Sequence, residues 1–124
     1  MQLIVMTKGI KSMGQIIKIK PNGTVEKIDC DNITLDYLQS EVDGYIETLR
    51  IKDAPDRCLI MIIDEEGKLK NKPVNELAGE IAYIRFDDYI VGDVIIVKEQ
   101  DDDFVPLTDD EADKFIDWLG EING

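Results

Sequence analysis

The hydrophobic pattern of the chain predicts two strands in the interior of a sheet. Residues 59–63 are five consecutive apolar side chains, and residues 94–97 form a second continuous apolar run. Short runs of this kind, rich in branched side chains and ended by polar turns, are typical of strands covered on both faces. We therefore expect both runs inside a single sheet, with residues 57–78 as the stretch around which the chain is organised.

A turn and a short helix are predicted directly after the first run. Gly67 can take the positive φ that a tight turn after residues 64–66 requires. Pro73 suits the first turn of a short helix over residues 74–78, and Gly79 suits its end. Buried and polar positions converge at this turn, so its polar side chains are candidate site residues.

A hairpin and a helix precede the central stretch. Residues 15–20 and 25–28 alternate on either side of a Pro-Asn-Gly-Thr turn, which predicts the hairpin. Thr34, or alternatively a residue at 31–32, is a fair N-cap for the helix, and Gly44 suits its end. Three apolar residues at helical spacing form its stripe: Leu35, Leu38 and Val42.

Residues 45–51 alternate strictly and predict a strand in one of two registers. In the first register Ile46 faces the core together with Thr48 and Arg50. In the second register Glu47 faces inward with three larger apolar or aromatic side chains, namely Tyr45, Leu49 and Ile51. The second register buries more apolar area but turns a carboxylate toward the core.

The C-terminal part of the chain ends in a helix. Thr108 and Glu111 form a capping box at its start. Its apolar stripe consists of Phe115, Trp118, Leu119 and Ile122. Residues 81–86 fit a strand and a helix equally. Together these elements indicate an α+β fold: a single domain with a mostly antiparallel sheet of about five strands and two main helices packed against one face of it.

The domain is expected to span residues 13–124, because Met13 opens the first clean strand pattern. Residues 1–12 would then be an N-terminal extension. The apolar run at residues 3–6 is too short for a signal peptide or a membrane span, so we expect a cytoplasmic protein. Cys30 and Cys58 do not have the spacing of a redox or zinc motif.

The charge of the chain is strongly negative and unevenly distributed. The formal net charge is −13. Residues 1–75 carry 11 Lys and Arg against 12 Asp and Glu, whereas residues 76–124 carry 3 against 15. Such a surface repels phosphate backbones and anionic lipid, so we expect no direct binding of nucleic acid or membrane. A basic protein partner would be attracted, although the charge can also serve solubility alone.

Most catalytic and metal-binding signatures are missing from the sequence. The chain has no histidine, which removes Ser-His-Asp and Cys-His nucleophiles and histidine-ligated metal sites. Asp101 does not begin an EF-hand loop, because Pro106 and Ala112 occupy the positions of the glycine and the bidentate glutamate. We expect no enzyme activity, no cofactor and no metal. Glu47 alone sits on an apolar strand face, as a candidate general acid or base or as half of an ion pair.

Several segments, taken in order, resemble the domain of unknown function family 3846. They are residues 44–47, residues 64–69 followed by Pro73 and Asn75, residues 90–93, and residues 107–111. The resemblance covers residues 14–117, and the chain departs from it in a longer N-terminus and in a long segment at 81–88. The family occurs in phages and bacterial mobile elements. The resemblance therefore implies an accessory role there, with no established activity.

Five positions are candidate binding residues on the basis of this resemblance: Tyr45, Glu47, Glu66, Lys68 and Asn75. They are polar or amphipathic positions that a fold alone would not obviously require. Asn75 can alternatively serve only as the cap of the short helix after Pro73.

Three functional hypotheses follow. The first, which we favour, is a non-catalytic acidic module that binds a protein partner, with an anti-defence role or mimicry of nucleic-acid charge as one variant. The second is a binder of a small molecule or nucleotide, in which Glu66, Lys68 and Asn75 line a pocket, in one version across a homodimer seam. Lys68, Lys70 and Lys72 would supply its positive charge. The third is an enzyme built on Glu47 or Glu66.

Overall fold

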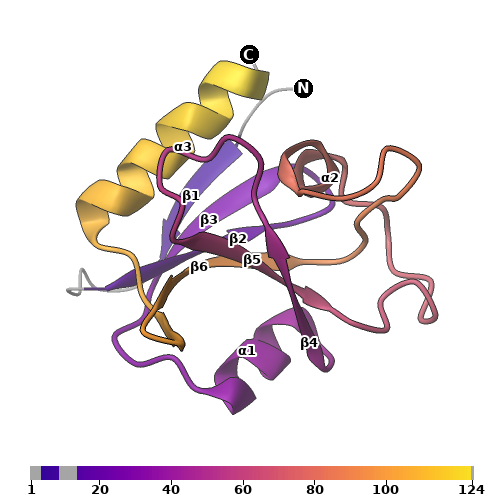
Figure 1. Ribbon diagram of the computed structural model, residues 1–124, viewed down its shortest axis with the longest axis horizontal. Helices are drawn as coiled ribbons and strands as arrows, with labels where there is room; N and C mark the ends of the chain where they lie inside the picture. The colour runs from indigo at the N-terminus through magenta and orange to yellow at the C-terminus, as the bar shows by residue number, and fades with distance from the viewer. Residues whose placement is uncertain (1–3, 9–13, 124) are drawn as a thin grey trace.

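Seven strands form one sheet, with helices on both of its faces, in the computed structural model, which describes residues 4–8 and 14–123 (Figure 1). The strands are β1 (Ile4–Lys8), β2 (Gln15–Ile19), β3 (Thr24–Asp29), β4 (Ile46–Arg50), β5 (Leu59–Asp64), β6 (Val94–Gln100) and β7 (Asp103–Val105). The helices are α1 (Leu35–Val42), α2 (Glu76–Ile81) and α3 (Asp109–Asn123). None of the helices in the described ranges has the length and apolar character needed to cross a bilayer.

The order of the sheet is β1-β3-β2-β6-β5-β4, and β7 pairs with the far end of β6. Every neighbouring pair is antiparallel except β1 and β3, which are parallel. The predicted α+β class and mostly antiparallel sheet are therefore confirmed. The two apolar runs are confirmed as neighbouring interior strands, since Met61 of β5 lies opposite Ile96 of β6.

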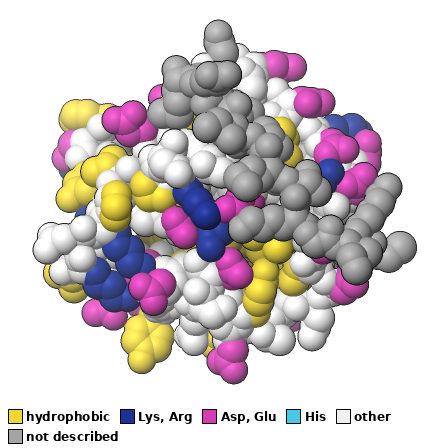
Figure 2. All heavy atoms as spheres, turned by 180° about the vertical axis from the view of Figure 1, so that it is seen from behind, with side chains coloured by type: hydrophobic (Ala, Val, Ile, Leu, Met, Phe, Trp, Pro, Cys, Tyr) yellow, Lys and Arg dark blue, Asp and Glu magenta, His cyan; other side chains and the backbone are white. Residues whose placement is uncertain are grey.

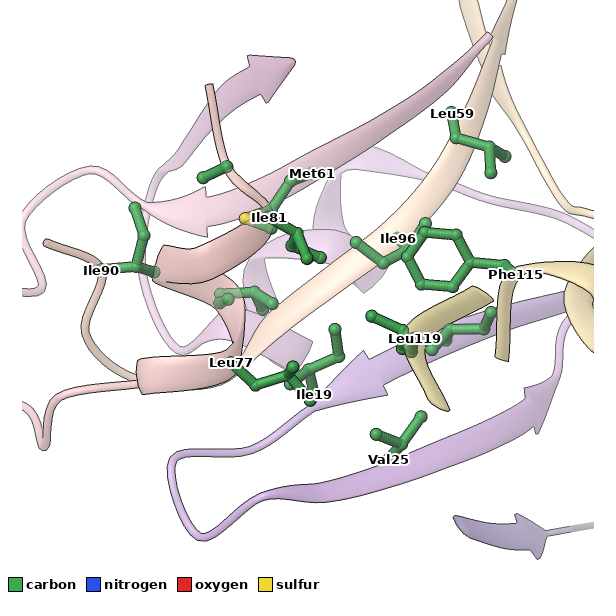
Figure 3. Close-up of a cluster of buried hydrophobic side chains, with 14 of the residues drawn as sticks. Ile19, Val25, Leu59, Met61, Leu77, Ile81, Ile90, Ile96, Phe115 and Leu119 are labelled. Atoms are coloured by element: carbon green, nitrogen blue, oxygen red, sulfur yellow. The ribbon is translucent and has the colours of Figure 1, made fainter. Parts of the chain in front are cut away.

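Two separate cores flank the sheet. The larger core lies under α2 and α3, where Met61 and Ile96 pack with Leu77 and Phe115 (Figure 3). The second lies under α1 and includes Leu38, with Ile62 and Ile95 from β5 and β6. The expectation that the helices share one face is wrong. Because β5 and β6 are apolar on both faces, each face needs a helix to remove it from water, and α1 covers the second one (Figure 1).

The predicted hairpin and both predicted helix caps are confirmed. β2 and β3 pair antiparallel across the turn at residues 20–23. The Thr34 hydroxyl accepts the Tyr37 N–H at 3.1 Å and caps α1. At the start of α3 the Glu111 carboxylate accepts the Thr108 N–H at 2.9 Å, and the Thr108 hydroxyl accepts the Glu111 N–H at 3.1 Å. α1 ends at Asp43, in the left-handed region, one residue before the predicted stop.

The turn after β5 differs from its prediction in two ways. Gly67 does not have a positive φ; among the described residues of this turn that conformation belongs to Asn71, at φ 56°. Glycine is needed at position 67 because a Cβ there would lie 2.8 Å from Cγ2 of Val91. The following helix begins after Asn75 and continues through Gly79 to Ile81. It ends where Ala82 forms an isolated bridge with Ile51, the residue that follows β4.

The strand β4 meets a core on each of its two faces, so neither of its two predicted registers holds alone. Leu49 and Ile51 pack against the core under α2 and α3, whereas Ile46 packs against the core under α1. Glu47 nevertheless remains exposed, as does Tyr45. The strand β4 therefore carries no buried carboxylate.

The N-terminal segment contributes an edge strand. β1 lies parallel to β3, with Ile4 opposite Thr24 and Lys8 opposite Ile28. The predicted boundary between an extension at 1–12 and a domain from 13 falls at residues outside the described ranges.

Candidate functional site

Two lysines of the turn after β5 converge on one buried carboxylate. Asp64, the last residue of β5, is 4% exposed. Its Oδ2 lies 2.9 Å from Nζ of Lys70 and 2.7 Å from Nζ of Lys72, and its Oδ1 accepts the Glu66 N–H at 2.9 Å. Burial by itself would raise the pKa of Asp64, but hydrogen bonds from Lys72 and Lys70 outweigh it and hold the pKa below its usual range.

The same two ammonium groups also bind the C-terminus of α1. Lys72 donates to the carbonyl oxygens of Val42 and Asp43, at 2.7 and 3.0 Å, and Lys70 donates to that of Asp43 at 2.9 Å. Cations at this end of a helix satisfy free carbonyl groups and favour the helix dipole. The lysine cluster expected to bind a ligand is therefore occupied by contacts within the chain.

Two of the five sequence candidates meet in a small crevice beside β4. Glu47 and Lys68 line it together with Asp88 and Tyr89, and its volume is about 110 Å³. Lys68 forms an ion pair with Asp88, and its Nζ lies 4.4 Å from the centre of the Tyr89 ring. The hydrogen bond to Asp88 raises the pKa of Lys68. Ligand sites usually span roughly 300–1,000 Å³, so this crevice is too small for a metabolite.

The other three candidates lie apart from the crevice. Tyr45 is 65% exposed, and Glu66 is exposed at the start of the turn that follows β5. Asn75 is completely buried. Its Oδ1 accepts the Ala78 N–H at 3.1 Å, and its Nδ2 donates to the carbonyls of Ile19 and Gly92 at 3.0 and 2.8 Å. Asn75 therefore caps α2 and joins it to two other segments, and both of its side-chain N–H groups and its carbonyl oxygen are hydrogen-bonded internally.

The exposure of Glu47 bears on the acid–base hypothesis. A general acid or base needs a carboxyl group that is removed from water, so that its pKa is raised toward the working pH. Glu47 lies in an open crevice and is exposed. Glu47 therefore lacks the water-excluding environment that the acid–base hypothesis requires.

The carboxylates of the C-terminal segment are divided between ion pairs and free positions. Seven of the fifteen at residues 76–124 pair with a described cation: Asp87, Asp88, Asp93, Asp109, Asp110, Glu111 and Asp113. Several of these cations come from the other half of the chain, as when Lys27 of β3 binds Asp109 and Asp113 of α3. Figure 2 shows acidic and basic side chains next to one another over the rear face, with hydrophobic side chains between them.

A groove at the opposite end of β4 has a different charge balance. Its volume is about 570 Å³, and it lies between the loop joining β4 to β5 and the residue Tyr83 that follows α2. Arg50, Lys52 and Arg57 line it. We call it the basic groove. Sequence reasoning missed it, although three cations within the eight residues 50–57 could have indicated it.

The three cations of the basic groove stand out because they are not neutralised. Every other lysine and arginine between residues 14 and 123 has a carboxylate partner. For Arg50, Lys52 and Arg57, no carboxylate oxygen in the described ranges lies within 4.0 Å of a side-chain nitrogen. A further pocket of about 410 Å³ contains Lys20 and Lys72, but both of these are paired, with Glu26 and Asp64.

A loop with exposed aromatic side chains follows α2. Tyr83 is 71% exposed, Phe86 is 99% exposed and Tyr89 is 48% exposed. We call residues 83–89 the aromatic loop; it projects from the right of the molecule in Figure 1. The pattern of apolar residues along the sequence does not show which of these side chains the fold leaves uncovered.

Comparison with protein families gives one match. The model of the family described as Domain of unknown function (DUF3846) matches residues 13–120, which includes β2 to β7 and all three helices apart from the last turn of α3. No curated protein and no solved structure matches the chain. Since the match covers most of its length, the chain belongs to this domain family of unknown function.

Proposed function

We propose that this protein is a non-catalytic binding module that docks onto a basic protein partner through the aromatic loop. The observation that carries this proposal is Phe86, whose side chain is 99% exposed in the middle of that loop. Aromatic side chains are the commonest anchors of protein interfaces, because each removes a large apolar area from water when it enters a pocket on the partner.

The loop is held in a defined shape around Phe86. On one side, the Tyr83 N–H donates to the Arg50 carbonyl of β4 at 2.8 Å. On the other side, Asp88 pairs with Lys68 and accepts the Tyr89 N–H at 2.8 Å, while its own N–H donates to the Arg85 carbonyl at 3.0 Å. An anchor presented on a prearranged loop loses less conformational freedom on binding, which favours affinity.

The overall charge of the protein supports a basic partner. The net charge of −13 gives the protein a negative field that attracts cationic proteins and accelerates their encounter. Glu76 and Glu80 of α2 are exposed and have no ion-pair partner in the described ranges, and Asp87 is exposed beside Phe86. A partner with an apolar pocket and a rim of lysine or arginine would match this surface.

The setting that we propose is the cytoplasm of a bacterium that carries a phage or mobile element, where the module would act as an accessory protein. The variant in which the protein mimics nucleic-acid charge gains no support from the ion pairs described above. Such mimicry needs a regular row of free negative charges, whereas about half of the C-terminal carboxylates here are paired. Partner docking through the aromatic loop needs no such row.

A quantitative pull-down from bacterial lysate tests this proposal. The bait proteins are the wild type, Phe86→Ala and the control Leu35→Ala, each used at about 50 mM and about 500 mM salt. Leu35 is also an exposed apolar residue, at 56%, but it begins α1 on the opposite face of the sheet. We expect a partner that wild type and Leu35→Ala recover equally, that Phe86→Ala recovers at least about tenfold less, and that high salt weakens.

Recovery of the same proteins in the same amounts by wild type and Phe86→Ala would contradict docking through the loop. A partner whose recovery does not change with salt would contradict the part of the proposal that concerns charge. Because Phe86 makes almost no contact within the chain, its replacement leaves folding intact, and thermal unfolding of both variants verifies this.

A further inference from the structure

The backbone prearranges the basic groove. Arg50 is the last residue of β4, and Lys52 lies in the turn that follows it. The Lys52 N–H donates to the Ile81 carbonyl, and the Tyr83 N–H donates to the Arg50 carbonyl, both at 2.8 Å. The intervening residue Ile51 packs into the core. These contacts fix the backbone from which Arg50, Lys52 and Tyr83 project.

The third cation comes from the far side of the loop. Arg57 lies two residues before β5, where the Glu99 N–H of β6 binds the Cys58 carbonyl at 2.8 Å. The loop lies on the side of the sheet that carries α2 and α3 (Figure 1). The groove is therefore bordered by segments that are remote in sequence and separately anchored to the sheet.

The local carboxylates do not neutralise these cations. Asp56 is turned back toward its own backbone, where its Oδ1 accepts the Cys58 N–H at 2.8 Å. Asp53 lines the groove at a positive φ of 56°, yet it forms no ion pair with a groove cation in the described part of the chain. The protein has 27 acidic and 14 basic residues, so acidic partners are abundant. Three cations that nevertheless have no ion-pair partner in the described ranges indicate a binding site for an external anion.

We propose that the basic groove binds a small ligand that carries both phosphate groups and an aromatic ring, that is, a nucleotide. The guanidinium groups of Arg50 and Arg57 supply paired donors that match phosphate oxygens, and Lys52 adds a point charge. Tyr83 is 71% exposed at the groove and offers a face on which a base stacks. The volume of about 570 Å³ is that of a metabolite site.

The charge of the whole protein limits the size of this ligand. A long nucleic acid would extend beyond the groove over a surface with a net charge of −13, which repels each additional phosphate. A mononucleotide places its few charges within reach of the three cations and little beyond them. The groove therefore fits a free nucleotide better than a DNA or RNA strand.

Titration calorimetry in magnesium-free buffer at about 50 mM salt tests this proposal, with ATP, tripolyphosphate and adenosine as three separate probes. ATP is expected to bind with a dissociation constant below about 1 mM. Tripolyphosphate, which lacks the ring, is expected to bind about tenfold more weakly than ATP. Adenosine, which lacks the phosphates, is expected to give no measurable binding at the same concentrations.

Four variants locate the binding. Arg50→Gln and Arg57→Gln are each expected to weaken ATP binding about tenfold, because each removes charge-assisted hydrogen bonds. Tyr83→Ala is expected to weaken ATP about tenfold while leaving tripolyphosphate within about twofold. Lys114→Gln is the charge-matched control; Lys114 is an exposed lysine of α3 that pairs with Asp110, and its loss should change ATP binding less than about twofold.

The results that overturn the proposal are distinct from one another. No binding of ATP or tripolyphosphate at about 1 mM would remove the anion site. An equal loss of ATP affinity in Arg50→Gln and Lys114→Gln would show that ATP is attracted by the overall charge and not bound in the groove. Equal affinity for ATP and tripolyphosphate, unchanged in Tyr83→Ala, would overturn the nucleotide assignment. None of these results depends on the protein partner, which the Phe86→Ala pull-down tests separately.

Discussion

Lys72 neutralises the buried carboxylate of Asp64 with an ammonium nitrogen only 2.7 Å from Oδ2. The same nitrogen lies 2.7 Å from the carbonyl oxygen of Val42, the last residue of α1. One side chain thus ties the end of the central strand β5 to the end of the helix that covers one face of the sheet. This contact explains why a lysine stands at a position where the sequence suggested a ligand.

Replacing Lys72 should destabilise the protein more than replacing its neighbour Lys70. Lys72→Met leaves a buried carboxylate with one cation fewer and frees two helix carbonyls, and we expect a loss of about 2 kcal/mol in the free energy of unfolding. Lys70 is more exposed, at 41% against 15% for Lys72, so Lys70→Met should cost clearly less. Urea unfolding of the three proteins measures both losses. Equal losses would show that the two lysines share the contact evenly.

The pKa of Asp64 predicts how stability changes in acid. Burial raises this pKa and the hydrogen bonds from Lys72 and Lys70 lower it further than burial raises it, so the folded value lies below the usual 3.8. A carboxylate of this kind contributes stability above the unfolded pKa and loses it as the pH falls through the folded pKa. The free-energy difference between wild type and Asp64→Asn should therefore be largest near neutral pH and should shrink below about pH 4.

Urea unfolding of both proteins between about pH 2 and 7 gives this difference directly. The pKa values of Asp88 and Glu111 are also lowered, Asp88 mainly by its hydrogen bond to Lys68, and Glu111 because bonds from Thr108 and Lys98 outweigh its burial. These two carboxylates contribute equally to both proteins and cancel in the comparison. A difference that stays constant down to pH 2 would contradict the role of Asp64.

Asn75 should be among the most sensitive polar positions in the protein. Asn75→Ala removes three hydrogen bonds and leaves the Ile19 and Gly92 carbonyls and the Ala78 N–H buried without these partners. We expect a loss of about 3 kcal/mol. Thr34→Ala removes the corresponding cap of α1 at an exposed position and should cost about 1 kcal/mol. Equal losses would mean that Asn75 acts only as a cap and not as a link between segments.

Gly44 and Gly79 should respond to alanine with opposite signs. A Cβ at Gly44 would lie 2.7 Å from Nζ of Lys70 and would clash with the Asp64 carboxylate, so Gly44→Ala should cost about 2 kcal/mol. At Gly79, inside α2, the nearest atom to an added Cβ is the Ile90 nitrogen at 4.0 Å. Gly79→Ala should therefore stabilise the protein by about 0.5 kcal/mol. Thermal and urea unfolding measure both changes, and a stable Gly44→Ala would show that the Asp64 cluster is not tightly packed.

Local patterns predicted most of the elements, because their physical causes are local. The apolar runs of β5 and β6, the hairpin of β2 and β3, and the caps at Thr34 and Thr108 all depend on residues within a few positions of one another. The order of strands in the sheet depends on contacts between distant segments. Nothing in the pattern around α1 shows that it crosses to the face opposite α2 and α3.

The candidate site was harder to predict for the same reason. The sequence suggested three unpaired lysines, at positions 68, 70 and 72. Their partners, Asp64, Asp88 and the C-terminus of α1, come into contact with them only in the folded chain. The basic groove showed the reverse: its cations are close in sequence to Asp53 and Asp56, yet the loop geometry keeps them unpaired. Whether a charged side chain is neutralised depends on the fold, so a count of residues along the chain does not show which charges are paired.

Tyr83 belongs to two proposed surfaces at once, since its ring borders the basic groove and its backbone begins the aromatic loop. Occupancy of either surface would restrict this same residue. Thermodynamic linkage then makes the effect mutual: the factor by which a bound nucleotide changes affinity for the partner equals the factor by which the partner changes affinity for the nucleotide. A domain of this size would thereby report the level of a metabolite as a change in the strength of a protein complex.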